Sequence, residues 1–252
     1  MSAQRDALQI PVDGLTLSAT IMTPAARIPG VLFVHGWGGS QEQDLRRARG
    51  IAALGCICLT FDLRGHASRV EDQKQVSRGD NLSDVVAAYD VLARQPAVDP
   101  DAIAVIGSSY GGYLGSLLTD LRLVRWLGLR VPALYRDTQW DDPKAALNRD
   151  DLVRYRRERV DVKDNRALEA CSRFEGDVLV IKSEHDELIP HQTILSYRNA
   201  FQQARSLTFR TISGADHSLS DPDCDQAYTS LLTSWTTEMI LGARLSTKPL
   251  SA

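Results

Sequence analysis

The sequence predicts an α/β protein built on a doubly wound, mostly parallel sheet. Short apolar strand patterns alternate with helical patterns along most of the chain, and glycine-rich turns follow several of the strands. The unbroken apolar run at 30–34 is typical of a strand that helices cover on both faces, as in a parallel sheet. Because 252 residues are enough for one large core, we expect residues 1–252 to form a single domain.

The first elements expected are two extended runs, 8–12 and 15–22, joined by Asp13 and Gly14, a pair that favours a tight hairpin turn. Strands and helices then alternate up to a long final helix. Further strands are expected at 30–34, 56–61, 104–106, 126–134, 177–181 and 207–212, and helices at 41–54, 82–94, 113–123, 166–174, 191–203 and 223–241.

Residues 135–165 interrupt this alternation. They mix acidic and basic side chains densely and contain few large apolar residues, so they cannot form a core of their own. We expect a small inserted cap of one or two short helices over the edge of the sheet, with disorder as the alternative. Trp140 and Tyr155 in this segment are candidates for lining a substrate pocket, whereas its arginines are expected on a solvated helical face.

Composition narrows the classes of partner. The formal net charge is −3 with both signs interspersed, which argues against a nucleic acid or an anionic membrane as partner. The chain starts without an apolar leader and its longest apolar stretch, 51–61, is too short to span a bilayer, so we expect a cytoplasmic protein. The cysteines are scattered and are interpreted as reduced and structural, with no metal site: Cys56, Cys58, Cys171 and Cys224.

A serine between glycines follows the β-branched run at 104–106. Gly107 and Gly111 lie two positions before and after Ser109, where side chains would collide in a sharp strand-to-helix turn. Such a turn exposes the serine hydroxyl. Ser108 is a poorer nucleophile candidate because Ile106 and Tyr110 lie where that turn would need glycines. Ser109 is therefore the predicted nucleophile, provided that a base and oxyanion donors accompany it.

An acid and a histidine follow two later strands, in the order serine, acid, histidine. His217 would accept the Ser109 proton and deliver it to the leaving group, and Asp186 would fix the imidazole tautomer and stabilise its cation. The order of the three residues is the one expected for a nucleophile elbow on an α/β sheet. Competing carboxylates lie close by in the sequence: Glu184, Glu187 and Asp216.

Two backbone N–H groups are expected to hold the oxyanion. One belongs to Tyr110, directly after the nucleophile at a helix N-terminus, and the other most plausibly belongs to Trp37 in the glycine-rich turn after the strand at 30–34. Both residues can also pack as aromatics, since the oxyanion role uses only their backbone.

Together these motifs resemble the α/β-hydrolase superfamily over nearly the whole chain. The matching stretches are His-Gly-Trp-Gly-Gly at 35–39, Asp-Leu-Arg-Gly-His at 62–66 and Gly-Ser-Ser-Tyr-Gly-Gly at 107–112, with Asp186 before Ile-Pro and His217 after Asp. The resemblance implies an eight-stranded, mostly parallel sheet with a small cap. Within the superfamily the pattern is similar to small serine esterases of the dienelactone-hydrolase, feruloyl-esterase and monoacylglycerol-lipase neighbourhood, although dienelactone hydrolases proper use cysteine.

The resemblance implies hydrolysis of carboxylic esters, short-chain or aryl, through an acyl-serine and without a cofactor or metal. The serine motif also resembles the catalytic domain of prolyl-oligopeptidase-type peptidases, so a peptidase or amidase is the first alternative. These relatives usually carry a large N-terminal domain, for which we expect no room here. A carbon–carbon bond hydrolase and a noncatalytic binding protein on the same fold are further alternatives. The expected partner is a small-molecule ester, and the final helix, rich in Leu, Trp and Met, leaves a homo-oligomer open.

Overall fold

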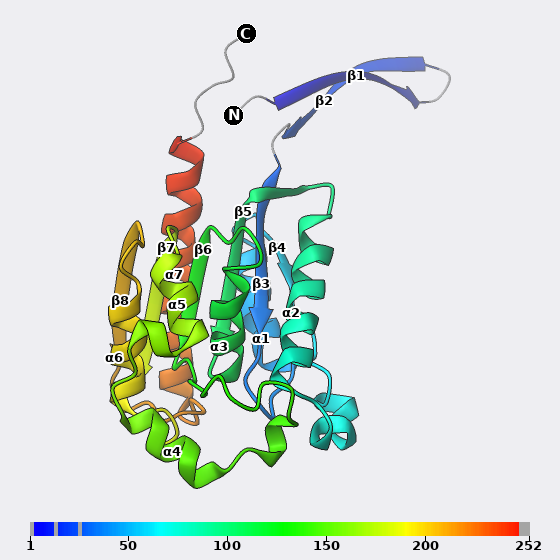
Figure 1. The fold of residues 1–252 in the computed structure, drawn as a ribbon. Helices are drawn as coiled ribbons and strands as arrows, with labels where there is room; N and C mark the ends of the chain where they lie inside the picture. The colour runs from blue at the N-terminus through cyan, green and yellow to red at the C-terminus, as the bar shows by residue number, and fades with distance from the viewer. Residues whose placement is uncertain (1–2, 13–14, 25–26, 247–252) are drawn as a thin grey trace.

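The computed structural model describes the backbone of residues 3–12, 15–24 and 27–246, and the side chains of residues 27–242. Its centre is a parallel sheet of six strands in the order β4-β3-β5-β6-β7-β8 (Figure 1). The six strands are β3 (Ile28–Val34), β4 (Ile57–Leu59), β5 (Val98–Ser108), β6 (Trp126–Arg130), β7 (Asp177–Ser183) and β8 (Ser206–Ile212). The helices that join and cover them are α1 (Glu42–Ala52), α2 (Arg78–Ala93), α3 (Tyr110–Leu118), α5 (Arg166–Arg173), α6 (His191–Ala200) and α7 (Pro222–Ser246).

Helices cover both faces of the sheet, and the alternation of side chains along the strands explains why the strand sequences are apolar throughout. In β3, Leu32 and Val34 belong to the larger apolar core, which contains side chains of α2, α3, α5 and α6. Val31 and Phe33 belong to the second core, beneath α1 and α7. The sheet is therefore doubly wound, as the sequence predicts.

The predicted count of eight strands in one sheet is wrong, because the main sheet has six. The first two strands, β1 (Ala3–Val12) and β2 (Leu15–Pro24), pair antiparallel with each other in a separate two-stranded sheet. The turn residues Asp13 and Gly14 lie outside the described residues. β3 already has a neighbour on each side, and the edge strand β4 is only three residues long. That edge offers few unpaired backbone groups for a hairpin to join.

Residues 135–165 contain η2 (Lys144–Ala146), α4 (Arg149–Arg157) and η3 (Val162–Asp164), and we refer to them as the cap segment. Figure 1 shows α4 beyond the end of the sheet toward which β3 points. Asn148 begins α4 by accepting a hydrogen bond from Asp151 N at 2.9 Å. The cap segment thus lies at the edge where the strand-following loops gather. In the described part of the chain, no helix is both long and apolar enough to cross a membrane.

Candidate active site

Ser109 lies at the junction of β5 and α3 in a backbone conformation that few residues adopt. Its φ is 51° and its ψ is −112°, outside the regions favoured by non-glycine residues. The surrounding structure holds this conformation: Ser109 N donates to Arg130 O at 2.9 Å, and Ser109 O accepts from Ala133 N at 2.9 Å. A strained serine held by neighbouring backbone is the arrangement that presents a nucleophile to solvent.

The two flanking glycines permit this turn for steric reasons. A Cβ on Gly107 would lie 2.4 Å from Gly111 O, and a Cβ on Gly111 would lie 2.0 Å from Val34 O. Both distances are far inside van der Waals contact with backbone atoms, which cannot move aside without displacing β3 or α3. The glycine spacing noted in the sequence is thus a packing requirement of the crossing between β3 and α3.

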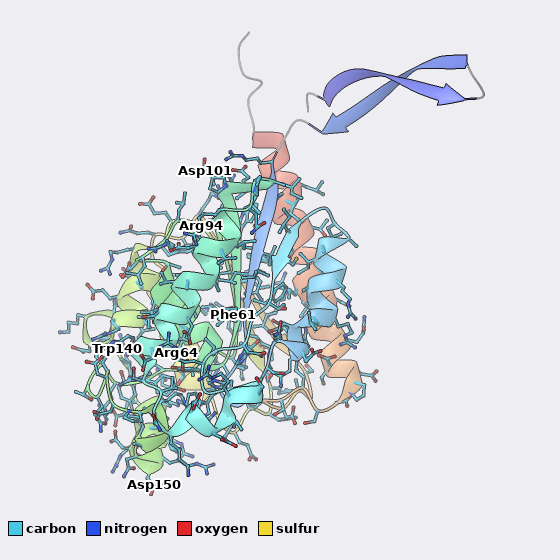
Figure 2. All side chains as sticks on the ribbon, turned by 90° about the vertical axis from the view of Figure 1, so that its right-hand side faces the viewer. Phe61, Arg64, Arg94, Asp101, Trp140 and Asp150 are labelled. Carbon is cyan, nitrogen blue, oxygen red and sulfur yellow. The ribbon has the colours of Figure 1, made fainter. Side chains whose placement is uncertain are left out.

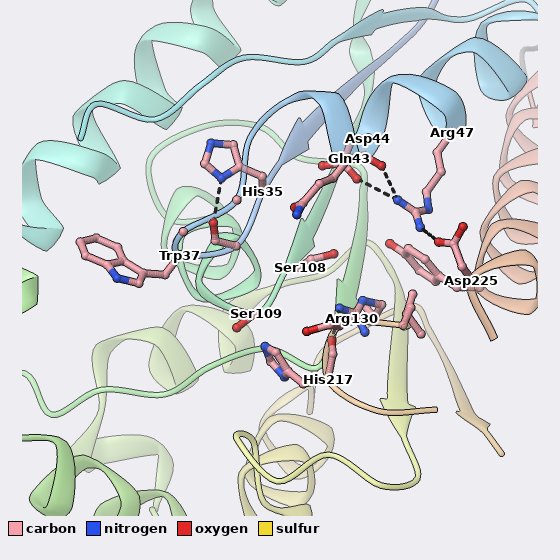
Figure 3. A pocket seen from close by; sticks show the side chains of 16 residues that line it. His35, Trp37, Gln43, Asp44, Arg47, Ser108, Ser109, Arg130, His217 and Asp225 are labelled. Atoms are coloured by element: carbon pink, nitrogen blue, oxygen red, sulfur yellow. Dashed lines mark hydrogen bonds and ion pairs between the residues drawn. The ribbon is translucent and has the colours of Figure 1, made fainter. Parts of the chain in front are cut away.

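His217 and Asp186 form a hydrogen-bonded pair beside Ser109. His217 Nδ1 lies 2.7 Å from Asp186 Oδ2, and the other Asp186 oxygen accepts from Leu188 N at 2.8 Å and Ile189 N at 2.7 Å. The Asp186 side chain is 2% exposed. These backbone donors and the histidine satisfy a buried carboxylate and fix its orientation. In Figure 3 the Ser109 hydroxyl faces the His217 ring.

The competing acids have other partners. Glu184 accepts from Gly214 N at 2.8 Å, and Asp216 accepts from Ser220 N at 2.9 Å. Both hydrogen bonds hold the turns that carry the histidine. Glu187 is exposed. Among the carboxylates considered from the sequence, Asp186 is the one that contacts the imidazole.

A cavity of about 420 Å³ opens beside Ser109, between the turn after β3 and the start of α7. His217, Ser109 and Trp37 line it together with a charged wall. That wall is an acid-paired cluster in which Arg47 forms ion pairs with Asp225 and, at 3.5 Å, with Asp44 (Figure 3). Burial raises the pKa of Asp44 to about 6, although Arg47 opposes the shift.

Arg130 is a buried cation beneath the triad. Its guanidinium donates to His217 O at 2.7 Å and to Ser183 Oγ at 3.3 Å, so it ties the histidine loop to the end of β7. Burial lowers the pKa of Arg130, while the nearby Tyr228 and Asp186 oppose that shift. No signal in the sequence distinguished this arginine, because it lies inside an otherwise ordinary strand pattern.

The two predicted oxyanion donors belong to two turns that contact each other. Tyr110 is the first residue of α3, and Trp37 lies in the turn closed by Gly39 N donating to Gly36 O at 3.0 Å. Within the described residues, neither the Trp37 N–H nor the Tyr110 N–H has a hydrogen-bond acceptor. A Cβ on Gly36 would lie 3.4 Å from Ser109 Cβ, so the two turns are in contact.

His35 holds the Trp37 turn in place. Its Nδ1 lies 2.8 Å from Gly36 O, and its Nε2 accepts from Leu63 N at 3.1 Å, which links the loops after β3 and β4. Because the side chain is buried, the pKa of His35 is lowered and the neutral form is favoured. His35 thus has a structural hydrogen-bonding role, in keeping with what the resemblance to α/β-hydrolases implies for it.

Trp140 and Tyr155 do not line the cavity of Ser109. The Arg166 guanidinium lies 4.3 Å from the ring centroid of Trp140, which Figure 2 labels in the lower half of the molecule. Tyr155 is buried, and its hydroxyl accepts from Asn165 Nδ2 at 3.1 Å. Both aromatics stabilise the cap segment.

Sequence reasoning missed two cap-segment residues that pack against Trp37 and Tyr110, although neither lines the cavity of Ser109. Lys144 Nζ lies 3.6 Å from the ring centroid of Trp37, 4.9 Å from that of Tyr110 and 5.3 Å from that of Tyr135. Tyr135 is buried against both Tyr110 and Tyr113. We call the three rings around Lys144 the aromatic cage; a single lysine in a polar run carries no sequence signal for such a position.

Comparison with known proteins identifies relatives of this arrangement. The family model described as the prolyl oligopeptidase family matches residues 43–242. A probable dipeptidyl-aminopeptidase B of Talaromyces marneffei is 29% identical over 119 residues, which are 42% of this chain but only 13% of that protein. An uncharacterized protein of Mycobacterium tuberculosis is 27% identical over 227 residues, covering 88% of this chain and 75% of that protein.

The fold also has close counterparts among solved structures. Dienelactone hydrolase from Anabaena variabilis superposes with a TM-score of 0.60 at 20% identity, over 94% of this chain and 98% of that one. This likeness shows the fold, whereas the family match spans Ser109, Asp186 and His217. The chain belongs to the prolyl oligopeptidase family and has the α/β-hydrolase fold.

Proposed function

We propose that this protein is a serine hydrolase that cleaves carboxylic esters through an acyl-serine intermediate. The observation that carries the proposal is the hydrogen bond between His217 Nδ1 and the buried Asp186 carboxylate, beside a strained Ser109. An imidazole oriented through Nδ1 keeps Nε2 available to accept a serine proton. Family membership and the shared fold agree with hydrolase chemistry.

In the first half-reaction Ser109 Oγ attacks the ester carbonyl carbon while its proton passes to His217 Nε2. The carbonyl oxygen becomes an oxyanion, which the Trp37 and Tyr110 N–H groups stabilise. The carbon–oxygen bond to the alcohol then breaks, and His217 returns the proton to the leaving oxygen. Water repeats the sequence on the acyl-serine, releasing the acid and restoring the Ser109 hydroxyl.

The first experiment measures hydrolysis of 4-nitrophenyl esters from acetyl to palmitoyl by wild type and Ser109→Ala. We expect turnover by wild type alone, with the variant still folded, because Ser109 is half-buried in a turn and belongs to neither apolar core. The acyl length with the highest kcat/KM would define the size of the acyl pocket. Equal background rates from both proteins would contradict the mechanism and favour a binding protein on the hydrolase fold.

A peptidase or amidase is the second candidate, favoured by the family match and by the dipeptidyl-aminopeptidase relative. Esters are the first class to test because an alkoxide or phenoxide is a better leaving group than an amine. Aminoacyl 4-nitroanilides measured beside the esters separate the two. A higher Ser109-dependent kcat/KM on the anilides would replace the ester proposal with an amidase.

A further inference from the structure

Lys144 is an unusual neighbour for a catalytic serine. Its ammonium lies against the aromatic cage of Trp37, Tyr110 and Tyr135, two of whose members supply the proposed oxyanion donors. In the described part of the chain, Lys144 forms no ion pair with an Asp or Glu and no side-chain hydrogen bond. Contacts with rings attract a cation but do not neutralise its charge.

The surroundings of Lys144 add positive charge. Arg78 lies 5.7 Å from the Tyr135 ring centroid and Arg156 lies 5.0 Å from it, and both are buried. Arg78 donates to the carbonyls of residues 136, 138 and 139, and Arg156 donates to the carbonyls of residues 134 and 188. Neither forms an ion pair within the described residues. We refer to Arg78, Lys144 and Arg156 as the acid-free cluster.

Backbone contacts hold Lys144 in this position. Lys144 N donates to Val76 O at 2.9 Å, and Pro143 forms an isolated antiparallel bridge with Ser77. Ser77 in turn caps α2 through a reciprocal pair of hydrogen bonds with Asp80. The lysine therefore enters the cage from an anchored backbone and not from a free loop.

The two arginines direct most of their donor groups at carbonyls, although Arg78 Nε has no acceptor, whereas none of the three donors of Lys144 has an acceptor in the described part of the chain. A desolvated ammonium without acceptors is costly, and an incoming anion would remove that cost. Burial and the neighbouring Arg156 and Arg78 lower the pKa of Lys144 to about 6. A bound carboxylate would raise that pKa again, because an opposite charge favours the ammonium form.

We propose that Lys144 binds a carboxylate on the substrate, so that the preferred substrates are esters carrying a second, ionised acid group. The proposal rests on the ester-hydrolase function above and adds its substrate class. Of the three cage residues, Trp37 lines the cavity of Ser109, so the part of the substrate between the ester and the carboxylate would pass along the Trp37 ring. Lys144 is then a specificity determinant that makes no contact with the reacting atoms.

Two matched pairs of esters test the proposal on either side of the ester bond. The first pair is the mono-4-nitrophenyl ester of terephthalic acid and 4-nitrophenyl 4-methylbenzoate, with the carboxylate on the acyl part. The second is the acetate of 4-hydroxybenzoic acid and 4-methylphenyl acetate, with the carboxylate on the alcohol part. Neither anionic ester can attack its own carbonyl, and in each pair a methyl group replaces the carboxylate.

The quantity measured is the ratio of kcat/KM for the anionic ester to kcat/KM for its neutral partner. We expect this ratio to exceed one in at least one pair and to fall about tenfold in Lys144→Met, as expected for losing a charged hydrogen bond. Lys144→Arg should retain most of the preference. Lys163→Met, at an exposed lysine of the same cap segment, is the matched control and should leave the ratio unchanged.

The pH dependence of the same ratio gives a second readout. A pH effect on the chemical step is shared by both members of a pair, so it cancels in the ratio. The groups facing Lys144 are Arg78, Arg156, His66 and the cage tyrosines. As pH rises from about 5.5 to about 8.5, the free lysine loses its proton and we expect the ratio to fall in wild type. Lys144→Met should show a flat ratio.

The outcomes separate the two proposals. Ser109-dependent cleavage with a ratio at or below one in both pairs, or with a ratio unchanged in Lys144→Met, overturns the carboxylate subsite and leaves the esterase intact. A purely structural lysine would lower activity on both members of a pair equally, which is the same negative result. If wild type cleaves none of the four esters, the carboxylate subsite falls, and the 4-nitrophenyl acetyl-to-palmitoyl series decides separately whether the ester-hydrolase proposal stands.

Discussion

The acid-paired cluster and the acid-free cluster both contain basic side chains, but they differ in whether those side chains form ion pairs with carboxylates. In the acid-paired cluster, Arg47 is bound by Asp44 and Asp225, and this network joins α1 to α7. In the acid-free cluster, Arg78, Lys144 and Arg156 face aromatic rings and backbone carbonyls. The first cluster is internally neutralised and connects elements of the fold. The second has no carboxylate partner in the described part of the chain, and the proposed substrate carboxylate would supply one.

The largest effect is expected on kcat, when the carboxylate that orients His217 is replaced. Asp186→Asn keeps the shape of the side chain but favours the wrong imidazole tautomer, so we expect kcat to fall about 10⁴-fold. Steady-state kinetics on the best 4-nitrophenyl ester measures the loss. Glu187→Gln, at the exposed neighbouring carboxylate, is the control and should retain kcat. A loss below tenfold in Asp186→Asn would mean that another acid orients His217.

Removing an acid from the acid-paired cluster should destabilise the fold. In Asp225→Asn, Arg47 loses its closer ion pair and keeps the 3.5 Å ion pair with Asp44 and the hydrogen bond to Gln43 O, while its side chain stays 9% exposed. We expect a loss of about 2–3 kcal/mol in the free energy of unfolding, measured by urea denaturation. Asp223→Asn, exposed in the first turn of the same helix, should change it little. Equal effects of the two substitutions would show that the cluster is not a stabilising network.

Removing the Lys144 cation from the acid-free cluster should change the free energy of unfolding in the opposite direction and stabilise the fold. The pKa of Lys144 is about 6 in the folded protein and 10.5 as the reference value, so the unfolded state binds more protons between these values. This group therefore makes stability rise with pH over that range. We expect Lys144→Met to be more stable than wild type near pH 6.5, with the advantage shrinking toward pH 9.5.

Denaturation of both proteins at the two pH values measures this difference. If Lys144→Met is less stable than wild type at pH 6.5, then the contacts with the aromatic cage outweigh the unpaired charge, and the distinction between the two clusters weakens.

The smallest effect is expected at a loop outside both clusters. Ala67 follows the His66 turn with φ of 50°, a left-handed conformation that costs free energy for a residue with a Cβ. Ala67→Gly should raise the free energy of unfolding by about 0.5–1 kcal/mol without changing the ester ratio. Ala53→Gly, at φ of −64°, should lower it. A destabilised Ala67→Gly would show that the alanine methyl packs favourably there.

Much of the fold and the triad could be predicted from short sequence patterns. The glycines around Ser109 have one steric reason to be there, and the acid and histidine each follow a strand at the same sheet edge. The docking of the first hairpin was not predictable, because pairing of edge strands depends on backbone groups and not on the apolar pattern. For the same reason β4 is shorter than its apolar sequence suggests.

The position of Lys144 was equally hidden. Its placement depends on the Ser77–Pro143 bridge, a contact between residues 66 positions apart that leaves no periodicity in the sequence. Trp140 and Tyr155 were chosen as pocket residues because they are the large aromatics of the cap segment. Both side chains pack within the cap segment instead, where Trp140 contacts Arg166 and Tyr155 contacts Asn165.

The bridge between Ser77 and Pro143 also links the stability of α2 to the position of Lys144. Ser77 caps α2, and its backbone also pairs with Pro143, the residue directly before Lys144. If Lys144 binds the substrate carboxylate as proposed, substitutions at this cap would alter heat tolerance and substrate choice together. Homologues that diverge at Ser77 would then diverge in the charge of the esters they accept, even where every residue around Ser109 is retained.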